Sequence, residues 1–165
     1  MPISLLFSTK IYLMMSELSI VPFSDQYFMK LALQEAQLAY EAEEVPIGAV
    51  IVSRDTVIGR GHNLTETLQD VTAHAEMIAL TAAQNYLGCK VLPDCTLYVT
   101  VEPCVMCAGA IRHSRLKRVV WGADEPKSGN TRFSDDILHP STLVTRGILA
   151  EECASLMQDF FRHRR

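Results

Sequence analysis

The segment from residue 95 to residue 123 constrains the fold of this chain more than any other. CTLYVTV (95–101) and LKRVVWGA (116–123) are short runs rich in β-branched and aromatic residues, typical of strands. Between them, PCVMCAGAIRHS (103–114) begins with a proline suited to a helix start and contains small residues that permit close packing. A strand, a helix and a second strand in this order predict a crossover between two parallel strands.

The remaining segments extend this pattern to both sides. Two apolar runs separated by SRDT predict a hairpin, and strands that alternate with helices favour a sheet covered on both faces. We therefore expect an α/β protein, a three-layer α/β/α sandwich with a central mixed sheet of about five strands. Further helices are expected at 24–44, 72–88 and 149–165, and further strands at 47–53, 57–63 and 141–146.

The composition fits one soluble domain. The chain has 165 residues, of which 48% are hydrophobic and 21% charged, which is enough apolar material for a single core. The net charge of −4 argues against a surface that binds nucleic acid everywhere, but it permits a local basic patch. Five cysteines, two of them spaced Cys-x-x-Cys, do not suit a secreted disulfide framework and favour a cytoplasmic protein.

The first fourteen residues, MPISLLFSTKIYLM, resemble neither a signal peptide nor a membrane span. They have no basic n-region and no cleavage pattern, and they are too short to cross a bilayer. Residues 1–14 are expected to be a mis-called extension or a disordered tail. Residues 15–165 are expected to form a single domain without membrane contact.

Two short motifs carry groups that can hold a metal and move protons. Cys104 and Cys107 are i, i+3 neighbours at a predicted helix start, where free N–H groups favour thiolates. With His74 they make three ligands suited to zinc, and no second pair completes a closed structural site. Three protein ligands leave a position for water, and Glu76 can take a proton from that water. Alone, Cys-x-x-Cys would also suit a dithiol redox protein.

His74-Ala75-Glu76 followed by Pro103-Cys104-x-x-Cys107 resembles the zinc-dependent cytidine/deoxycytidylate deaminase superfamily. The wider match, from about residue 27 to residue 165, is similar to the bacterial tRNA adenosine deaminases, which make inosine at the wobble position of the anticodon. It includes EVPIGAVIV, GRGHN, TAHAEM, TLYVTVEPCVMCAGAI, HSR and DFFRHRR.

The resemblance implies a cytidine deaminase-like fold and one zinc ion per chain, held by His74, Cys104 and Cys107, with Glu76 as the general acid/base. It also implies a tRNA anticodon stem-loop as substrate, a cytoplasmic location and a homodimer with the Cys107–Ile111 region near its interface. The residues that it implies for substrate contact are Asn63, Ala75, Val45, Pro46, Glu125, Lys127, Phe160, Phe161 and Arg164.

Two departures from the family pattern concern the substrate. Many relatives have Asp where this chain has Glu125, and a longer connection between Pro140 and Gly147. The shorter connection and the acidic net charge leave open, as an alternative, a deaminase of a free base, nucleoside or nucleotide of guanine or cytosine type. Two further alternatives are a catalytically silent zinc-bearing RNA-binding module and the dithiol redox protein. Tyr86, Tyr98 and Trp121 are expected to be core or near-core aromatics.

Overall fold

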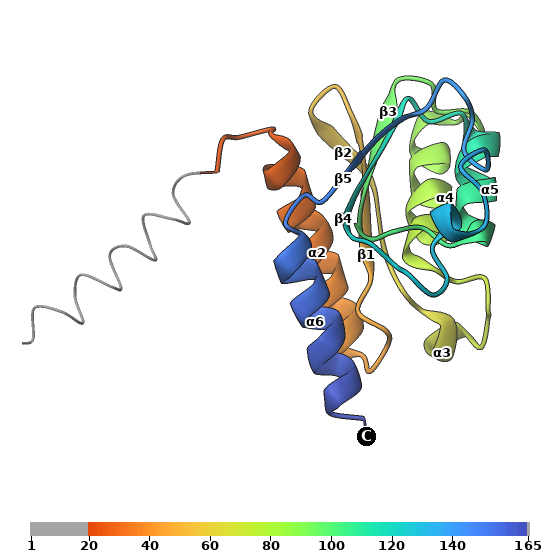
Figure 1. Ribbon diagram of the computed structural model, residues 1–165. Coiled ribbons are helices and arrows are strands. Elements are labelled where there is room, and N and C mark those ends of the chain that lie inside the picture. Colours follow the sequence, from red (N-terminus) through yellow and green to blue (C-terminus); the bar gives the residue numbers. More distant parts are fainter. Residues whose placement is uncertain (1–19, 165) are drawn as a thin grey trace, which may run out of the picture.

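A five-stranded sheet in the order β2-β1-β3-β4-β5 forms the middle layer of the computed structural model, which describes residues 20–164 (Figure 1). The expectation for residues 1–14 therefore lies outside the described residues. The hairpin and the parallel crossover are both confirmed, since β1 pairs antiparallel with β2 and β3 pairs parallel with β4. The strands are β1 (Gly48–Ser53), β2 (Thr56–His62), β3 (Cys95–Val101), β4 (Arg118–Ala123) and β5 (Leu143–Arg146).

Helices cover both faces of this sheet, which confirms the three-layer architecture. Helices α2 (Asp25–Glu41) and α6 (Ala150–Arg162) lie on one face, and α4 (Ala75–Leu87) and α5 (Val105–Ser114) lie on the other (Figure 1). Two short elements, α3 (Thr65–Leu68) and a 3-10 turn at Asn130–Arg132, lie in connections and were not predicted. No helix within residues 20–164 is long and apolar enough to span a bilayer.

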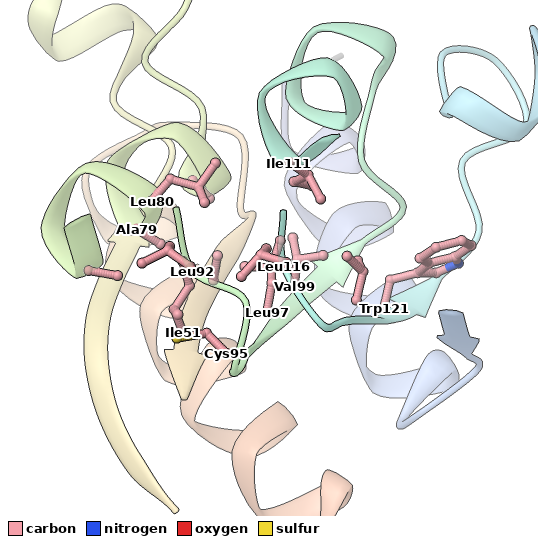
Figure 2. Close-up of a cluster of buried hydrophobic side chains, with 14 of the residues drawn as sticks. Ile51, Ala79, Leu80, Leu92, Cys95, Leu97, Val99, Ile111, Leu116 and Trp121 are labelled. Atoms are coloured by element: carbon pink, nitrogen blue, oxygen red, sulfur yellow. The ribbon is translucent and has the colours of Figure 1, made fainter. Parts of the chain in front are cut away.

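Alternation along the strands divides the core into two clusters. Leu97 and Val99 of β3 point toward α4 and α5, where they join the buried cluster shown in Figure 2. Tyr98, between them, points to the opposite face and packs with Phe28 of α2. Period-two alternation places successive side chains on opposite faces, so a nearly continuous apolar strand is buried on both sides. Tyr98 and Trp121 are buried as expected, but the prediction for Tyr86 was wrong, because this residue is 66% exposed.

Helix α4 packs unusually close to β2 because that strand contains glycine. A Cβ at Gly61 would lie 2.4 Å from the carbonyl oxygen of Ala75, and one at Gly59 would lie 2.4 Å from that of Ala79. Contacts this short do not occur, so only glycine lets the helix backbone come this near. Since Ala75 stands between His74 and Glu76, the packing of β2 sets the height of both functional side chains above the sheet.

The helix boundaries differ from the predicted ones in an informative way. The first helix ends at Glu41 and not at residue 44, because Glu43 adopts a left-handed conformation with φ 61°. The Glu43 and Glu44 N–H groups then donate to the carbonyl oxygens of Tyr40 and Ala39, which closes the helix end. Beyond this turn the chain continues through residues 45–47 into β1.

Candidate metal and active site

His74, Cys104 and Cys107 meet at one point between α4 and α5. His74 is the N-cap of α4, Cys104 is the N-cap of α5, and Cys107 lies in the first turn of α5. The His74 Nδ1 atom lies 3.6 Å from Cys104 Sγ and 3.5 Å from Cys107 Sγ. A tetrahedral zinc ion, with ligands at about 2.0 Å and 2.3 Å, requires roughly 3.5 Å between nitrogen and sulfur. Within residues 20–164 this is the only group of three such ligands with their donor atoms within 4.8 Å of one another.

The chemistry of this donor set also fits a cation. A hydrogen bond from the Cys107 thiol, followed by contact with His74, lowers the pKa of Cys104 to about 4, against the opposing effect of burial. The pKa of Cys107 is raised, because its proton is held by Cys104 and its sulfur is buried. One proton is therefore shared by two sulfurs, and a divalent cation between them would stabilise both as thiolates.

Glu76 stands in the first turn of α4, two residues after His74. It is 4% exposed, and burial raises the pKa of its carboxyl group to about 6, with the nearby Cys104 thiolate adding to the effect. A carboxyl group with a pKa near neutrality can both accept and return a proton, as a general acid/base must.

Glu76 and His74 open onto a cavity of about 190 Å³. Of the residues expected to contact the substrate, Asn63, Ala75 and Val45 line this cavity, whereas Pro46 is buried beside it and does not. The structure adds two lining residues that the sequence reasoning missed, Ile47 and Thr65. Ile47 directly follows Pro46 and Thr65 is two positions after Asn63, so each lies close in sequence to a residue that was singled out.

A second, larger cavity of about 580 Å³ shares Val45 and Ile47 with the first. Four residues expected to contact RNA come together here from two distant parts of the chain: Glu125, Lys127, Phe161 and Arg164. Phe161 is 47% exposed. Phe160 is not brought to this surface, because its ring is buried against Tyr40 and lies beneath the Arg164 guanidinium.

A buried carboxylate, Glu102, holds the loop that carries Glu125 and Lys127. Its oxygens accept hydrogen bonds from the Glu125 N–H at 3.0 Å, the Thr131 N–H at 2.9 Å and the Thr131 hydroxyl at 2.7 Å. Glu102 directly precedes Pro103 and Cys104, so one residue connects the predicted RNA-contacting loop to the thiolate helix. Sequence reasoning missed it, since a single Glu at a strand end is usually exposed.

The chain is similar to known deaminases over most of its length. The family model of MafB19-like deaminases matches residues 23–165. Two curated tRNA-specific adenosine deaminases are similar: that of Bacillus subtilis (strain 168) is 46% identical over 86% of this chain and 91% of its own length, and that of Streptococcus pyogenes serotype M18 is 44% identical over 84% and 91%.

A solved structure is also similar, from work on A-to-I editing by tRNA:A34 deaminases at the wobble position of transfer RNA. It is 45% identical, with a TM-score of 0.74, over 79% of this chain and 98% of that one.

Proposed function

Because the chain belongs to the tRNA-specific adenosine deaminase family, we propose that it converts adenosine to inosine at the wobble position of a tRNA anticodon. The observation that carries this proposal is the cavity lined by Glu76, His74 and Asn63, which adjoins the larger basic and aromatic cavity along the shared wall of Val45 and Ile47. The small cavity suits a single extruded base, and the large one suits the flanking nucleotides.

His74, Cys104 and Cys107 hold one zinc ion in this proposal, and the donor set and its spacing support that choice. Bound zinc lowers the pKa of water to roughly 7, so that a nucleophile is available at neutral pH. Glu76 accepts a proton from the attacking water and passes it to the adenine N1. It then accepts the remaining proton from the new C6 hydroxyl and passes it to the departing amino group, which leaves as ammonia. The oxygen of the water remains on C6 of the base.

The other predicted contacts follow from the two cavities. Val45 and Ala75 confine the base, and Asn63 contacts the nucleoside. Lys127 and Arg164 supply positive charge for the phosphate backbone, Glu125 lies in the same loop as Lys127, and Phe161 offers an exposed ring for stacking. Pro46 makes the backbone rigid where the chain enters β1. The Phe160 ring packs against the Arg164 guanidinium. We also propose a single domain over residues 15–165, a cytoplasmic location and a homodimer whose interface lies near α5.

Inosine formation in an arginine-tRNA anticodon stem-loop with adenosine at the wobble position tests the proposal. Wild type should form inosine, whereas Glu76→Gln should lose at least about 10²-fold in kcat, because no carboxylate remains to move the proton. Both proteins should contain about one zinc per chain by elemental analysis.

Zinc without deamination of the stem-loop would overturn the tRNA assignment, and turnover of free guanine or cytidine would then identify the alternative. Full activity in Glu76→Gln would overturn the assigned role of Glu76.

A further inference from the structure

Glu44 is a charged residue with no exposed surface, and it lies next to the cavity rather than in it. It is 0% exposed and follows the turn that ends α2. No ion pair among residues 20–164 includes it. Burying a carboxylate without a cation is unfavourable in free energy unless hydrogen bonds satisfy its oxygens. The hydrogen-bond partners of Glu44 therefore indicate what it does.

Four donors surround the Glu44 carboxylate. Oε1 accepts from the Thr67 N–H at 2.7 Å, and Oε2 accepts from the Glu66 N–H at 3.2 Å and the Thr65 hydroxyl at 3.4 Å. The fourth donor is the side-chain amide of Asn63, whose Nδ2 lies 3.2 Å from Oε2. Burial tends to raise the pKa of Glu44, but these hydrogen bonds outweigh it and hold the pKa below its ordinary value. The group is therefore a carboxylate at neutral pH.

A carboxylate can only accept hydrogen bonds, and this determines which way the Asn63 amide faces. Turning the amide over would place Oδ1 against Glu44 Oε2, two acceptors in contact. Asn63 Nδ2 is also 3.3 Å from the Thr65 hydroxyl, so the amino group is committed to this side.

The Asn63 carbonyl oxygen remains free in consequence. Oδ1 accepts no hydrogen bond from the described residues. Every fully buried side-chain nitrogen or oxygen within residues 20–164 has a hydrogen-bond partner, so Oδ1 is not fully buried. Asn63 lines the cavity that contains Glu76, so this oxygen is an acceptor open to that cavity.

We propose that Glu44 is a positioning residue, which holds the Asn63 amide so that its carbonyl oxygen accepts a hydrogen bond from a hydroxyl or N–H group of the bound nucleoside. The inference rests on the proposed function for the nature of the substrate. Glu44 touches no substrate itself. It acts through Asn63, and the same hydrogen bonds order the first turn of α3, which carries Thr65 into the cavity wall.

A double-mutant cycle tests whether Glu44 acts through Asn63. In Glu44→Gln the amide oxygen can keep the short bond from Thr67, while the new NH₂ group faces Asn63 and favours the inverted amide. We expect kcat/KM on the stem-loop to fall about 10- to 100-fold, the equivalent of one hydrogen bond to a charged group. In an Asn63→Ala background the same change should cost less than about threefold. An equal loss in both backgrounds, or no loss in the first, would overturn the proposal.

Glu35→Gln is the matched control. Glu35 is another buried carboxylate, 8% exposed, and it contacts His62 and Arg60 without lining either cavity of the site. Its removal should change kcat/KM by no more than about twofold in either background. A loss comparable to that of Glu44→Gln would show that any buried carboxylate has this effect.

Nitrogen-15 NMR of the wild-type protein tests the orientation of the Asn63 amide. It needs neither an activity measurement nor a Glu44 variant. The Asn63 NH₂ pair, assigned by its absence in Asn63→Ala, should be protected from exchange and show contacts to the Glu66 and Thr67 amides. Free exchange without these contacts would overturn the inference even if the stem-loop is edited. If the protected pair is found but the stem-loop is untouched, the proposed function fails and the positioning of Asn63 stands.

Discussion

Asp25 is a single residue that connects the start of the first helix to strands β3 and β4. Its carboxylate accepts two hydrogen bonds from the Arg118 guanidinium, at 2.8 Å and 2.7 Å, and one from the Tyr98 hydroxyl at 2.9 Å. The hydrogen bond from Arg118 lowers the pKa of Asp25 most, burial opposes it, and Tyr98 lowers it further. This fork-to-carboxylate geometry makes the pair stronger than an ordinary surface ion pair.

Asp25→Asn should reduce the free energy of unfolding at pH 7 by about 1 kcal/mol, a value discounted for partial exposure. The folded pKa lies below the unfolded value, so the carboxylate contributes stability above pH 4 and loses it as the pH falls through the folded pKa. Urea unfolding of both proteins from pH 7 to pH 3 measures the difference. A difference that persists undiminished at pH 3 would contradict this account, because Asp25 in the unfolded chain is protonated below its ordinary pKa of 3.8, which must reduce the contribution of the folded carboxylate.

At the scale of elements, the contact between β2 and α4 is the one on which the site depends. Gly61→Ala places a methyl group against the α4 backbone, so the helix must move with His74 and Glu76. Overpacking of this kind should lower the free energy of unfolding by about 1–3 kcal/mol and weaken zinc binding. Thermal unfolding and competition with a chromogenic chelator measure the two effects.

Thr81→Ala provides the control, since Thr81 is an exposed residue of the same helix α4 and lies away from the metal ligands. It should raise stability by about 0.5 kcal/mol through helix propensity. Similar losses in both variants would show that the tight contact at Gly61 is not the cause.

The turn between β1 and β2 contains residues that are not optimal for their backbone conformation. Arg54 and Asp55 both adopt left-handed conformations, with φ of 48° and 60°, as a type I′ hairpin turn requires. Asp55→Gly should raise the free energy of unfolding by about 0.5 kcal/mol, because glycine adopts this conformation without steric cost. Thr56→Gly, in the adjoining strand, should lower it by a similar amount. Chemical denaturation compares them, and a loss in Asp55→Gly would count against the turn assignment.

For the whole molecule, the metal site joins helices whose ligands are 30 and 33 residues apart in the chain. A ligand that binds only the folded state stabilises it by mass action, by about 4 kcal/mol at a thousand times Kd. Removing zinc with a chelator should therefore lower Tm by roughly 10 °C. In Cys104→Ser the Tm should not respond to the chelator. Equal sensitivity of both proteins would mean that the metal binds elsewhere.

Sequence reasoning succeeded where the determinants are local. The helix starts at residues 74–76 and 104–107 follow from spacing and from capping geometry, and both survive almost unchanged in the structure. The parallel crossover follows from the order of apolar runs and the handedness of the chain. The motifs and the family resemblance predicted His74, Cys104 and Cys107 as metal ligands. The structure places His74 Nδ1 3.6 Å from Cys104 Sγ and 3.5 Å from Cys107 Sγ.

Three features depended on contacts between distant segments. Tyr86 lies on an apolar helix but faces outward, because the adjacent face of α4 is the one that the sheet covers. Glu44 and Glu102 look like surface residues, yet each is buried by donors that lie 19 to 29 residues further along the chain. Phe160 and Phe161 are adjacent, but only the packing of α6 shows which ring is inside.

The sequence by itself therefore determined the chemical groups of the site, because helix starts and ligand spacing are set within a few residues. Only the tertiary structure decided how those groups are oriented. The direction of the Asn63 amide depends on a carboxylate 19 residues earlier, which is charged and satisfied only after α2, α3 and the sheet have come together. Burial and hydrogen-bond partners are properties of the assembled molecule, and no local pattern contains them.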